Sequence, residues 1–270
     1  MLLPLGMEIG APIGGDLGKL AFFFDRGVRY ITLAHSANNR IANSSYAQDK
    51  KWNGLSPFGR DVVAEMNRLG MMIDVSHLSD AAVAQAVELS RTPVVATHSA
   101  LRHFTPGFER NLSDELAKAI AAKDGVIQIP FGNAFVDTAS AAQTQAYFVA
   151  YNDYQRQRTA GTTTQTVAEF DAEWDKAHPP LPVKMKAVLD QIDYGVKLVG
   201  IDHIGIGSDF DGVGGALPEG LKTVADFPNL IAGLQTRGYR EADIRKILGG
   251  NLLRVWRRVE SAATPAAQTR

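Results

Sequence analysis

Residues 56–77 read SPFGRDVVAEMNRLGMMIDVSH, and they contain the pattern from which the fold class can be predicted. Ser56 is a good helix N-cap and Pro57 suits the first helical position, so a helix is expected to begin here. Apolar residues then recur at helical spacing over the next turns. The apolar run 71–75 predicts a buried strand that ends at His77. One helix and one strand, with an imidazole at the strand's end, therefore form the repeating unit.

The same alternation of strand and helix continues on both sides of this stretch. It predicts a parallel sheet with right-handed crossovers. Six strands are expected, near residues 2–7, 28–34, 71–75, 93–97, 125–129 and 203–206. Helices are expected at 15–25, 56–70, 80–89, from 113, and at 183–199, 223–237 and 241–259. A closed (β/α)8 barrel needs eight strands. Two alternatives stay open: an open doubly wound sheet, or a TIM-type barrel that lacks its first βα units.

Two segments interrupt the alternation. Residues 38–53 are polar and predict a long loop over one end of the sheet. Residues 137–181 are rich in Ala, Gln, Thr and Tyr and predict an inserted helical excursion, either a lid or a surface decoration. The barrel domain is therefore expected to span 1–260, and the tail 261–270 is expected to fray.

Composition narrows the function. The chain has 28 Lys and Arg residues and 29 Asp and Glu residues, so its net charge is -1. It therefore lacks the excess of positive charge that is typical of proteins that bind nucleic acid. The chain has no cysteine, which excludes disulfides, zinc–thiolate sites and thiol catalysis. No apolar run approaches the roughly 18 residues of a membrane helix. The first residues also lack the basic region of a signal peptide. Any metal must therefore be held by His, Asp or Glu.

Polar side chains follow the predicted strands at the edge where parallel sheets gather their ligands. Glu8, His35, His77, His98 and Asp209 each lie at or just past the carboxyl end of a strand. A single histidine in such a place is more often a structural hydrogen-bonding residue. Three histidines with two carboxylates favour a metal site of the zinc type.

Such a set of residues predicts metal-assisted hydrolysis of an amide or an ester. Neutral imidazoles would hold the ions, a carboxylate would bridge two of them, and Asp209 could accept the proton of a shared water. The glycines of 205–215 lack the spacing of a dinucleotide site. Ser76 and His77 are neighbours that point to opposite faces, so a Ser–His dyad is not expected. Arg110 is either a clamp for a substrate carboxylate or a surface ion-pair residue.

Nine motifs spread over most of the chain carry a family resemblance. They are GVRYITLAH (27–35), GR (59–60), EMNRLG (65–70), MIDVSH (72–77), VVATHS (94–99), RNL (110–112), GSDFDGV (207–213), PEG (218–220) and GNLLR (250–254). In this order they resemble the membrane dipeptidase (renal dipeptidase) family of zinc metallopeptidases, from Glu8 to about Glu260. The resemblance implies a (β/α)8 barrel that hydrolyses dipeptides with a metal-activated bridging water at a two-zinc site.

The resemblance also implies a role for each candidate residue. Glu8 matches the carboxylate that bridges the zinc ions, and His77 and His98 match the ligands of one zinc. Asp209 matches the aspartate at the other zinc, which handles the proton of the attacking water.

The two remaining candidates face the substrate. His35 matches the histidine that binds the scissile carbonyl, and Arg110 matches the clamp for the free carboxylate of a small dipeptide. A related metal-dependent amidohydrolase or lactonase on the same barrel is the alternative function.

One departure from the family concerns the second zinc. The family supplies a His-x-Asp pair from its first barrel strand, and no His-x-Asp occurs in this sequence. We therefore expect a chain that lacks the N-terminal part of the family, holds one zinc in place of two, and is either incomplete or a catalytically inactive remnant. A homodimer is expected by resemblance. The protein would be exported or periplasmic if a signal peptide lies in the missing part, and otherwise cytoplasmic.

Overall fold

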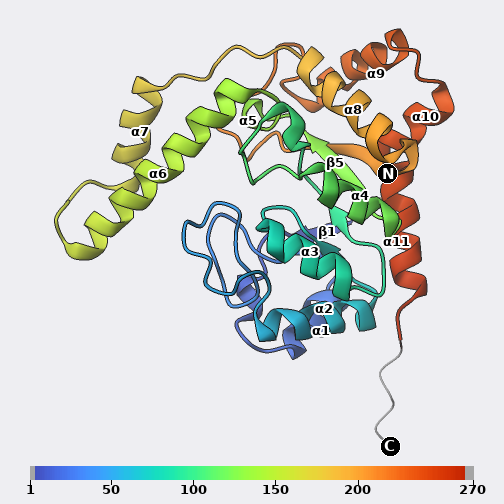
Figure 1. Cartoon of the computed structure of the whole chain (residues 1–270), viewed down its shortest axis with the longest axis horizontal. Coiled ribbons are helices and arrows are strands. Elements are labelled where there is room, and N and C mark those ends of the chain that lie inside the picture. The colour runs from blue at the N-terminus through green and yellow to red at the C-terminus, as the bar shows by residue number, and fades with distance from the viewer. Residues whose placement is uncertain (1–3, 265–270) are drawn as a thin grey trace, which may run out of the picture.

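Six short parallel strands form the centre of the protein in a computed structural model that describes residues 4–264 (Figure 1). They are β1 (Leu5–Met7), β2 (Val28–Thr32), β3 (Met72–Asp74), β4 (Val95–Ala96), β5 (Val126–Pro130) and β6 (Ile204–Ser208). The strands lie side by side in chain order from β1 to β6, and every neighbouring pair is parallel. A doubly wound sheet would reverse this order at a switch point. The sheet is instead wound in one direction and curls as a half-barrel.

All six predicted strands are present, with shorter or shifted ends. The expected strand 93–97 shrinks to Val95–Ala96, and part of the expected strand 2–7 lies outside the described residues. The helices are α1 (Gly18–Asp25), α2 (Pro57–Leu69), α3 (Asp80–Leu89), α4 (Asp114–Ala122), α5 (Asn133–Val136), α6 (Thr138–Ala160), α7 (Val167–Ala177), α8 (Lys186–Val199), α9 (Phe227–Thr236), α10 (Glu241–Arg245) and α11 (Asn251–Ser261). The structure thus confirms, with shifted ends, the helices predicted at 15–25, 56–70, 80–89, from 113, at 183–199 and at 223–237.

The start of α2 follows from its sequence. Ser56 Oγ accepts a hydrogen bond from the backbone N–H of Gly59 at 2.8 Å, as expected for an N-cap. Gly59 must be small, because a Cβ there would lie 2.1 Å from the carbonyl oxygen of Ile41. The helix therefore packs directly against the backbone of the loop that follows β2.

The prediction of one continuous helix over 241–259 is wrong. The helix is interrupted after α10 by a π-helical turn over Lys246–Gly250, and α11 begins at Asn251. Gly249 has φ 146°, a backbone conformation that side chains other than glycine rarely adopt. The Gly249–Gly250 pair thus changes the direction of the chain and allows α11 to run on a different path.

Helix α11 covers the end of the sheet at which the strands begin. Its residues Val255 and Val259 pack on Met72, Val95 and Val126. The next residues in these strands pack in one cluster with α2, α3 and α4; they are Ile73, Ala96 and Ile127. Because successive side chains of a strand point to opposite faces, α11 lies on the face of the sheet opposite to α2, α3 and α4. Both its ends meet segments that precede strands, since Asn251 Nδ2 donates to Ile201 O at 2.8 Å and Thr264 N donates to Arg68 O. The opposite edge is left to the loops that follow the strands.

Two segments lie beyond the regular βα units. Helices α6 and α7 form a hairpin that projects away from the sheet (Figure 1), with Gly161 at the end of α6 in a left-handed conformation. The loop over 38–53 lies near the carboxyl end of β2, because Ser44 Oγ donates to the carbonyl oxygen of His35 at 2.5 Å. Tyr46 of this loop stacks on Phe148 of α6, with ring centroids 4.0 Å apart.

Some expectations fall at the limits of the described residues. Helix α11 extends to Ser261, and most of the predicted tail 261–270 lies outside the described residues. No helix within 4–264 combines the length and the apolar character that crossing a membrane requires.

Candidate metal centre

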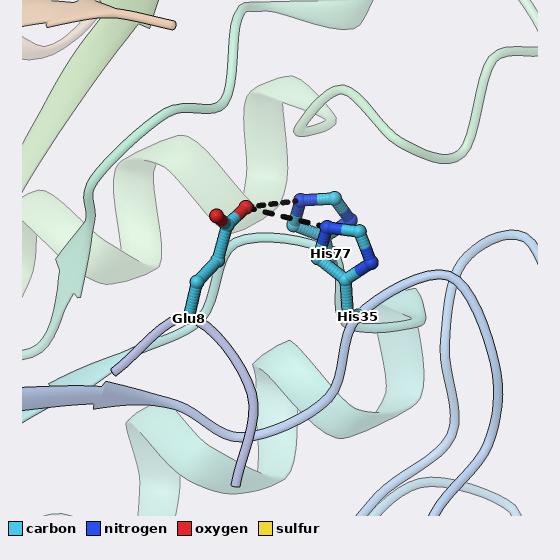
Figure 2. A group of neighbouring side chains, drawn as sticks. All are labelled: Glu8, His35 and His77. Atoms are coloured by element: carbon cyan, nitrogen blue, oxygen red, sulfur yellow. Dashed lines mark ion pairs between the residues drawn. The ribbon is translucent and has the colours of Figure 1, made fainter. Parts of the chain in front are cut away.

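Four of the predicted site residues come together at the carboxyl edge of the sheet. Glu8 follows β1, His35 follows β2, His77 follows β3 and His98 follows β4. These four strands are consecutive neighbours in one parallel sheet, so the segments that follow them reach the same edge. Figure 2 shows the carboxylate of Glu8 facing the imidazoles of His35 and His77.

The donor atoms of these residues are closely spaced. Oε1 of Glu8 lies 3.3 Å from Nε2 of His35, 3.3 Å from Nε2 of His77 and 3.1 Å from Nε2 of His98. The Nε2 atoms of His77 and His98 are 2.9 Å apart. The imidazoles of His35 and His77 stack with centroids 4.1 Å apart.

This spacing fits a zinc ion. Zn²⁺ binds nitrogen and carboxylate ligands at about 2.0–2.2 Å in a tetrahedron, which places neighbouring ligand atoms roughly 3.3 Å apart. The donor atoms of Glu8, His35 and His77 all lie within 4.8 Å of one another. Imidazole and carboxylate are also the ligands that zinc accepts without thiolate.

The electrostatics of the site favour the protonation states that a metal requires. Hydrogen bonds from His35, His77 and His98 hold the pKa of the Glu8 carboxyl far below its usual range. Burial, followed by the nearby positive charge of Arg110, lowers the pKa of His77 well below its ordinary value. Glu8 is therefore anionic and His77 neutral at physiological pH, which is the charge that each group carries as a metal ligand.

Arg110 is a buried cation next to this cluster. Only 3% of its surface is exposed, and burial lowers the pKa of its guanidinium. Its Nη1 donates to Ser99 Oγ at 2.9 Å, whereas Nε and Nη2 have no hydrogen-bond partner among the described residues. An unsatisfied buried guanidinium is costly, and a bound carboxylate would satisfy it. The alternative of a surface ion pair is therefore wrong.

Asp209 lies outside the cluster of Glu8 and the histidines. It follows β6, and its Oδ1 would be 2.6 Å from a Cβ built on Gly212, so the side chain lies against its own turn. Its negative charge nevertheless reaches Arg110, because it opposes the lowering of the pKa of that guanidinium. Asp209 therefore belongs to the same edge without contributing to the closest group of ligand atoms.

Backbone strain marks the same edge. His77 has φ 67°, and the consecutive residues Ser208 and Asp209 have φ 53° and 59°. Residues other than glycine seldom adopt this left-handed conformation, and such residues cluster at functional sites. The strained positions include two of the residues that the sequence assigned to the site.

Two residues near the site were not identified from the sequence. Tyr46 comes from the 38–53 loop and lies against His77 with ring centroids 6.1 Å apart, and burial raises its pKa to about 12. No pattern in that loop indicates this contact. Asp74 is fully buried beneath the histidines, and its signal was a single carboxylate within the apolar run 71–75.

Comparison with known proteins yields one family. The full chain, residues 1–270, matches the family model described as membrane dipeptidase (Peptidase family M19). Dipeptidase tcpJ of Claviceps purpurea is 31% identical over 259 residues, which cover 96% of this chain and 51% of that protein. Dipeptidase aclJ of Aspergillus oryzae is 32% identical over 265 residues, which cover 98% of this chain and 53% of that protein. The chain thus spans about half the length of these curated relatives.

Solved structures point to the same family. The probable dipeptidase PvdM from Pseudomonas aeruginosa superimposes with a TM-score of 0.78 at 36% identity, over 95% of this chain and 69% of that one. A metallo peptidase from Rhodobacter sphaeroides, solved with a phosphinate mimic of the dipeptide L-Ala-D-Ala, gives a TM-score of 0.73 at 28% identity, over 94% of this chain and 62% of that one. The sequence motifs, the half-barrel and these matches agree: the chain belongs to the membrane dipeptidase family, peptidase family M19.

Proposed function

We propose that the chain carries the active-site edge of a zinc-dependent dipeptidase. The observation that carries this proposal is the group of Glu8, His35, His77 and His98 around one space, with the guanidinium of Arg110 beside it, of which Nε and Nη2 have no partner among the described residues. The first group suits a divalent cation, and the second suits the free carboxylate that distinguishes a dipeptide from an internal peptide bond.

Glu8, His77 and His98 would hold the first zinc, with Glu8 as the carboxylate able to bridge to a second. Zinc, when bound, supplies a Lewis acid that polarises the scissile carbonyl and lowers the pKa of the attacking water. Glu8 and His77 already have the protonation states that this requires, because their pKa values are both lowered.

The other residues would act on the substrate. Arg110 would bind its terminal carboxylate through the two free nitrogens, which orients the peptide bond above the histidines. His35, with 40% of its side chain exposed, would donate a hydrogen bond to the oxygen of the scissile carbonyl as negative charge develops on it. Asp209 would take the proton of the attacking water and pass it to the leaving amine.

The six strands would be part of a (β/α)8 barrel. Such a barrel would take two further strands and a second set of zinc ligands from outside these six strands, and the matched structures do extend beyond the region that this chain covers. Where no further strands complete the barrel, the free sides of β1 and β6 are instead the surfaces through which two copies would pair as a homodimer. Small dipeptides are the proposed substrates, and the net charge of -1 supports no nucleic-acid partner.

Substitution of Arg110 tests the carboxylate clamp. Arg110→Ala is expected to raise KM for a dipeptide by 10-fold or more, which corresponds to about 1.4 kcal/mol for each factor of ten, while hydrolysis of the same dipeptide with an amidated C-terminus stays unchanged. Arg245→Ala is the matched control, because Arg245 is 76% exposed on α10. If the variant treats both substrates as the unsubstituted chain does, Arg110 does not bind the carboxylate.

A second candidate function is hydrolysis of another amide or of a lactone. A protein from Pseudomonas aeruginosa named an amidohydrolase superimposes with a TM-score of 0.74 at 26% identity. Chelator-sensitive turnover of N-acyl amino acids or lactones, without turnover of dipeptides, would support this alternative. Absence of any metal-dependent turnover would instead support an inactive remnant.

A further inference from the structure

Asp74, the last residue of β3, is a carboxylate that the proposed chemistry does not use. It is fully buried and accepts four hydrogen bonds. Its Oδ1 accepts from the backbone N–H groups of Ser76 and Thr97, each at 3.0 Å. Its Oδ2 accepts from the hydroxyls of Thr32 at 2.5 Å and Thr97 at 2.6 Å. The carboxylate thus ties three neighbouring strands together directly beneath the histidines.

The hydroxyl of Thr97 stands between Asp74 and His98. Its Oγ1 lies 2.6 Å from Oδ2 of Asp74 and 2.8 Å from Nδ1 of His98. A hydroxyl has one proton, and an ionised carboxylate can only accept. The proton of Thr97 is therefore directed to Asp74, and the hydroxyl oxygen offers a lone pair to His98. The Nδ1 atom of His98 must then carry a proton in order to complete the contact.

We propose that Asp74 is a positioning residue that acts through Thr97 to hold a proton on Nδ1 of His98. Nε2 is then the ring atom that faces the space shared with Glu8 and His77, where it would bind a metal in exchange for its hydrogen bond to Glu8. Ligating histidines in metalloproteins generally donate their other ring N–H to an acceptor of this kind. The part of this inference that concerns metal rests on the function proposed above.

The neighbouring histidines do not share this arrangement. Nδ1 of His77 is buried and has no hydrogen-bond partner among residues 4–264. Nδ1 of His35 contacts Ser36 Oγ at 2.9 Å, in a half-buried position. The backbone of His98 is held as well, since its N–H donates to Ser76 Oγ at 3.1 Å. Of these three rings, His98 alone is oriented by a chain of hydrogen bonds that ends on a buried carboxylate.

Substitution of Asp74 by its amide gives a sharp test. In Asp74→Asn the side-chain oxygen would keep the two backbone N–H groups, and the new NH2 would face the two hydroxyls. Thr97 would then accept from Asn and donate to Nδ1 of His98, which places the imidazole proton on Nε2. Two-bond ¹H–¹⁵N spectra of the metal-free chain at pH 8 are expected to show a proton on Nδ1 of His98 in the unsubstituted chain and an unprotonated Nδ1 in the variant.

Variants of Thr97 and Thr32 test the same inference in case Asp74→Asn does not fold. Thr97→Val removes the link to His98, Thr97→Ser restores it, and Thr32→Val removes the other hydroxyl bond to the same oxygen of Asp74 without touching His98. Zinc affinity, measured by chelator competition, is expected to fall 10- to 100-fold in Asp74→Asn and Thr97→Val. It should change less than threefold in Thr97→Ser and Thr32→Val.

The outcomes separate this inference from the proposed function. An unprotonated Nδ1 of His98 in the unsubstituted chain, or an unchanged Nδ1 and an unchanged zinc affinity in both Asp74→Asn and Thr97→Val, overturns the inference. A chain that binds no zinc contradicts the proposed function, yet the tautomer spectra still decide the role of Asp74. An equal loss of affinity in Thr32→Val and Thr97→Val also overturns it, because it shows a general effect of the carboxylate's packing.

Discussion

At the scale of single residues, the site depends on how closely the backbone of β6 approaches that of β4. Gly207 lies where an added Cβ would be 2.5 Å from the carbonyl oxygen of Thr97, 2.8 Å from that of Gln128 and 3.0 Å from Cα of His98. These neighbours are backbone atoms, which cannot rotate away as a side chain can. The position therefore fixes the distance between the two strands at the point where His98 leaves the sheet.

Gly207→Ala is expected to destabilise the fold and to disturb the site. Overpacking of this kind costs about 1–3 kcal/mol in the free energy of unfolding, and the displacement of His98 should weaken zinc binding in the same variant. Gly205→Ala is the matched control on the same strand, because its nearest neighbour is Cγ of Gln128 at 3.2 Å, a side-chain atom that can shift. Denaturant titration and zinc titration check both variants, and equal behaviour of the two would contradict the expectation.

Single residues also show how far sequence alone can predict this site. Glu8, His35, His77 and His98 could be found because parallel strands present their ends at one edge, so position along each strand determines proximity. Asp74 was not assigned, because its importance comes from contacts with Thr97, a residue 23 positions away. Tyr46 gave no signal at all, since an irregular loop has no period from which a contact can be inferred.

At the scale of secondary-structure elements, prediction succeeded where a local signal determines the result. The N-caps Ser56, Ser79 and Ser113 each accept the expected backbone hydrogen bond, and the helices begin there. The break at Gly249 was missed, because a glycine inside a helical pattern is compatible with both continuation and interruption. Only the tertiary path of α11 across the sheet edge decides between them.

One contact between elements gives a prediction for pH dependence. Tyr194 on α8 donates its hydroxyl to Oδ2 of Asp114 at the start of α4, at 2.6 Å. This hydrogen bond, assisted by burial, raises the pKa of Tyr194 to about 12. The pKa of an unperturbed tyrosine is about 10. A raised pKa in the folded state stabilises it fully below pH 10, and this contribution is lost as the pH rises from 10 toward 12.

The free energy of unfolding should therefore fall more steeply above pH 10 in the unsubstituted chain than in Tyr194→Phe. Denaturant titrations between pH 8 and pH 11.5 measure the two curves, and the difference between them isolates one ionisable group. Tyr151→Phe, in the hairpin of α6 and α7, controls for loss of a hydroxyl elsewhere. Parallel curves for the unsubstituted chain and Tyr194→Phe would show that the contact between α8 and α4 does not depend on the protonated hydroxyl.

At the scale of the whole molecule, the packing of α11 and the candidate metal site lie at opposite ends of the strands. Helix α11 covers the edge where the strands begin, and the loops with the ligand-type side chains follow the strands at the other edge. Sequence predicted this polarity from the alternation of strands and helices. Sequence could not predict that α11 turns across the sheet. The amphipathic pattern of a helix indicates that one of its faces is buried, but not which surface of the protein covers that face.

The ligand groups at the carboxyl ends of the strands predict how many zinc ions the chain binds. Glu8, His77 and His98 place three ligand atoms within 3.3 Å of one another, so we expect one zinc per folded chain by elemental analysis after dialysis. Binding only to the folded state should raise the free energy of unfolding by about 2.7 kcal/mol when free zinc is 100 times its Kd. His98→Ala should reduce both the zinc content and the stabilisation, and His203→Ala, which replaces a histidine at the opposite edge, should change neither. Two zinc ions per chain would contradict this expectation, because the second would require ligands such as Asp209 to move into a site that is not assembled in the present arrangement.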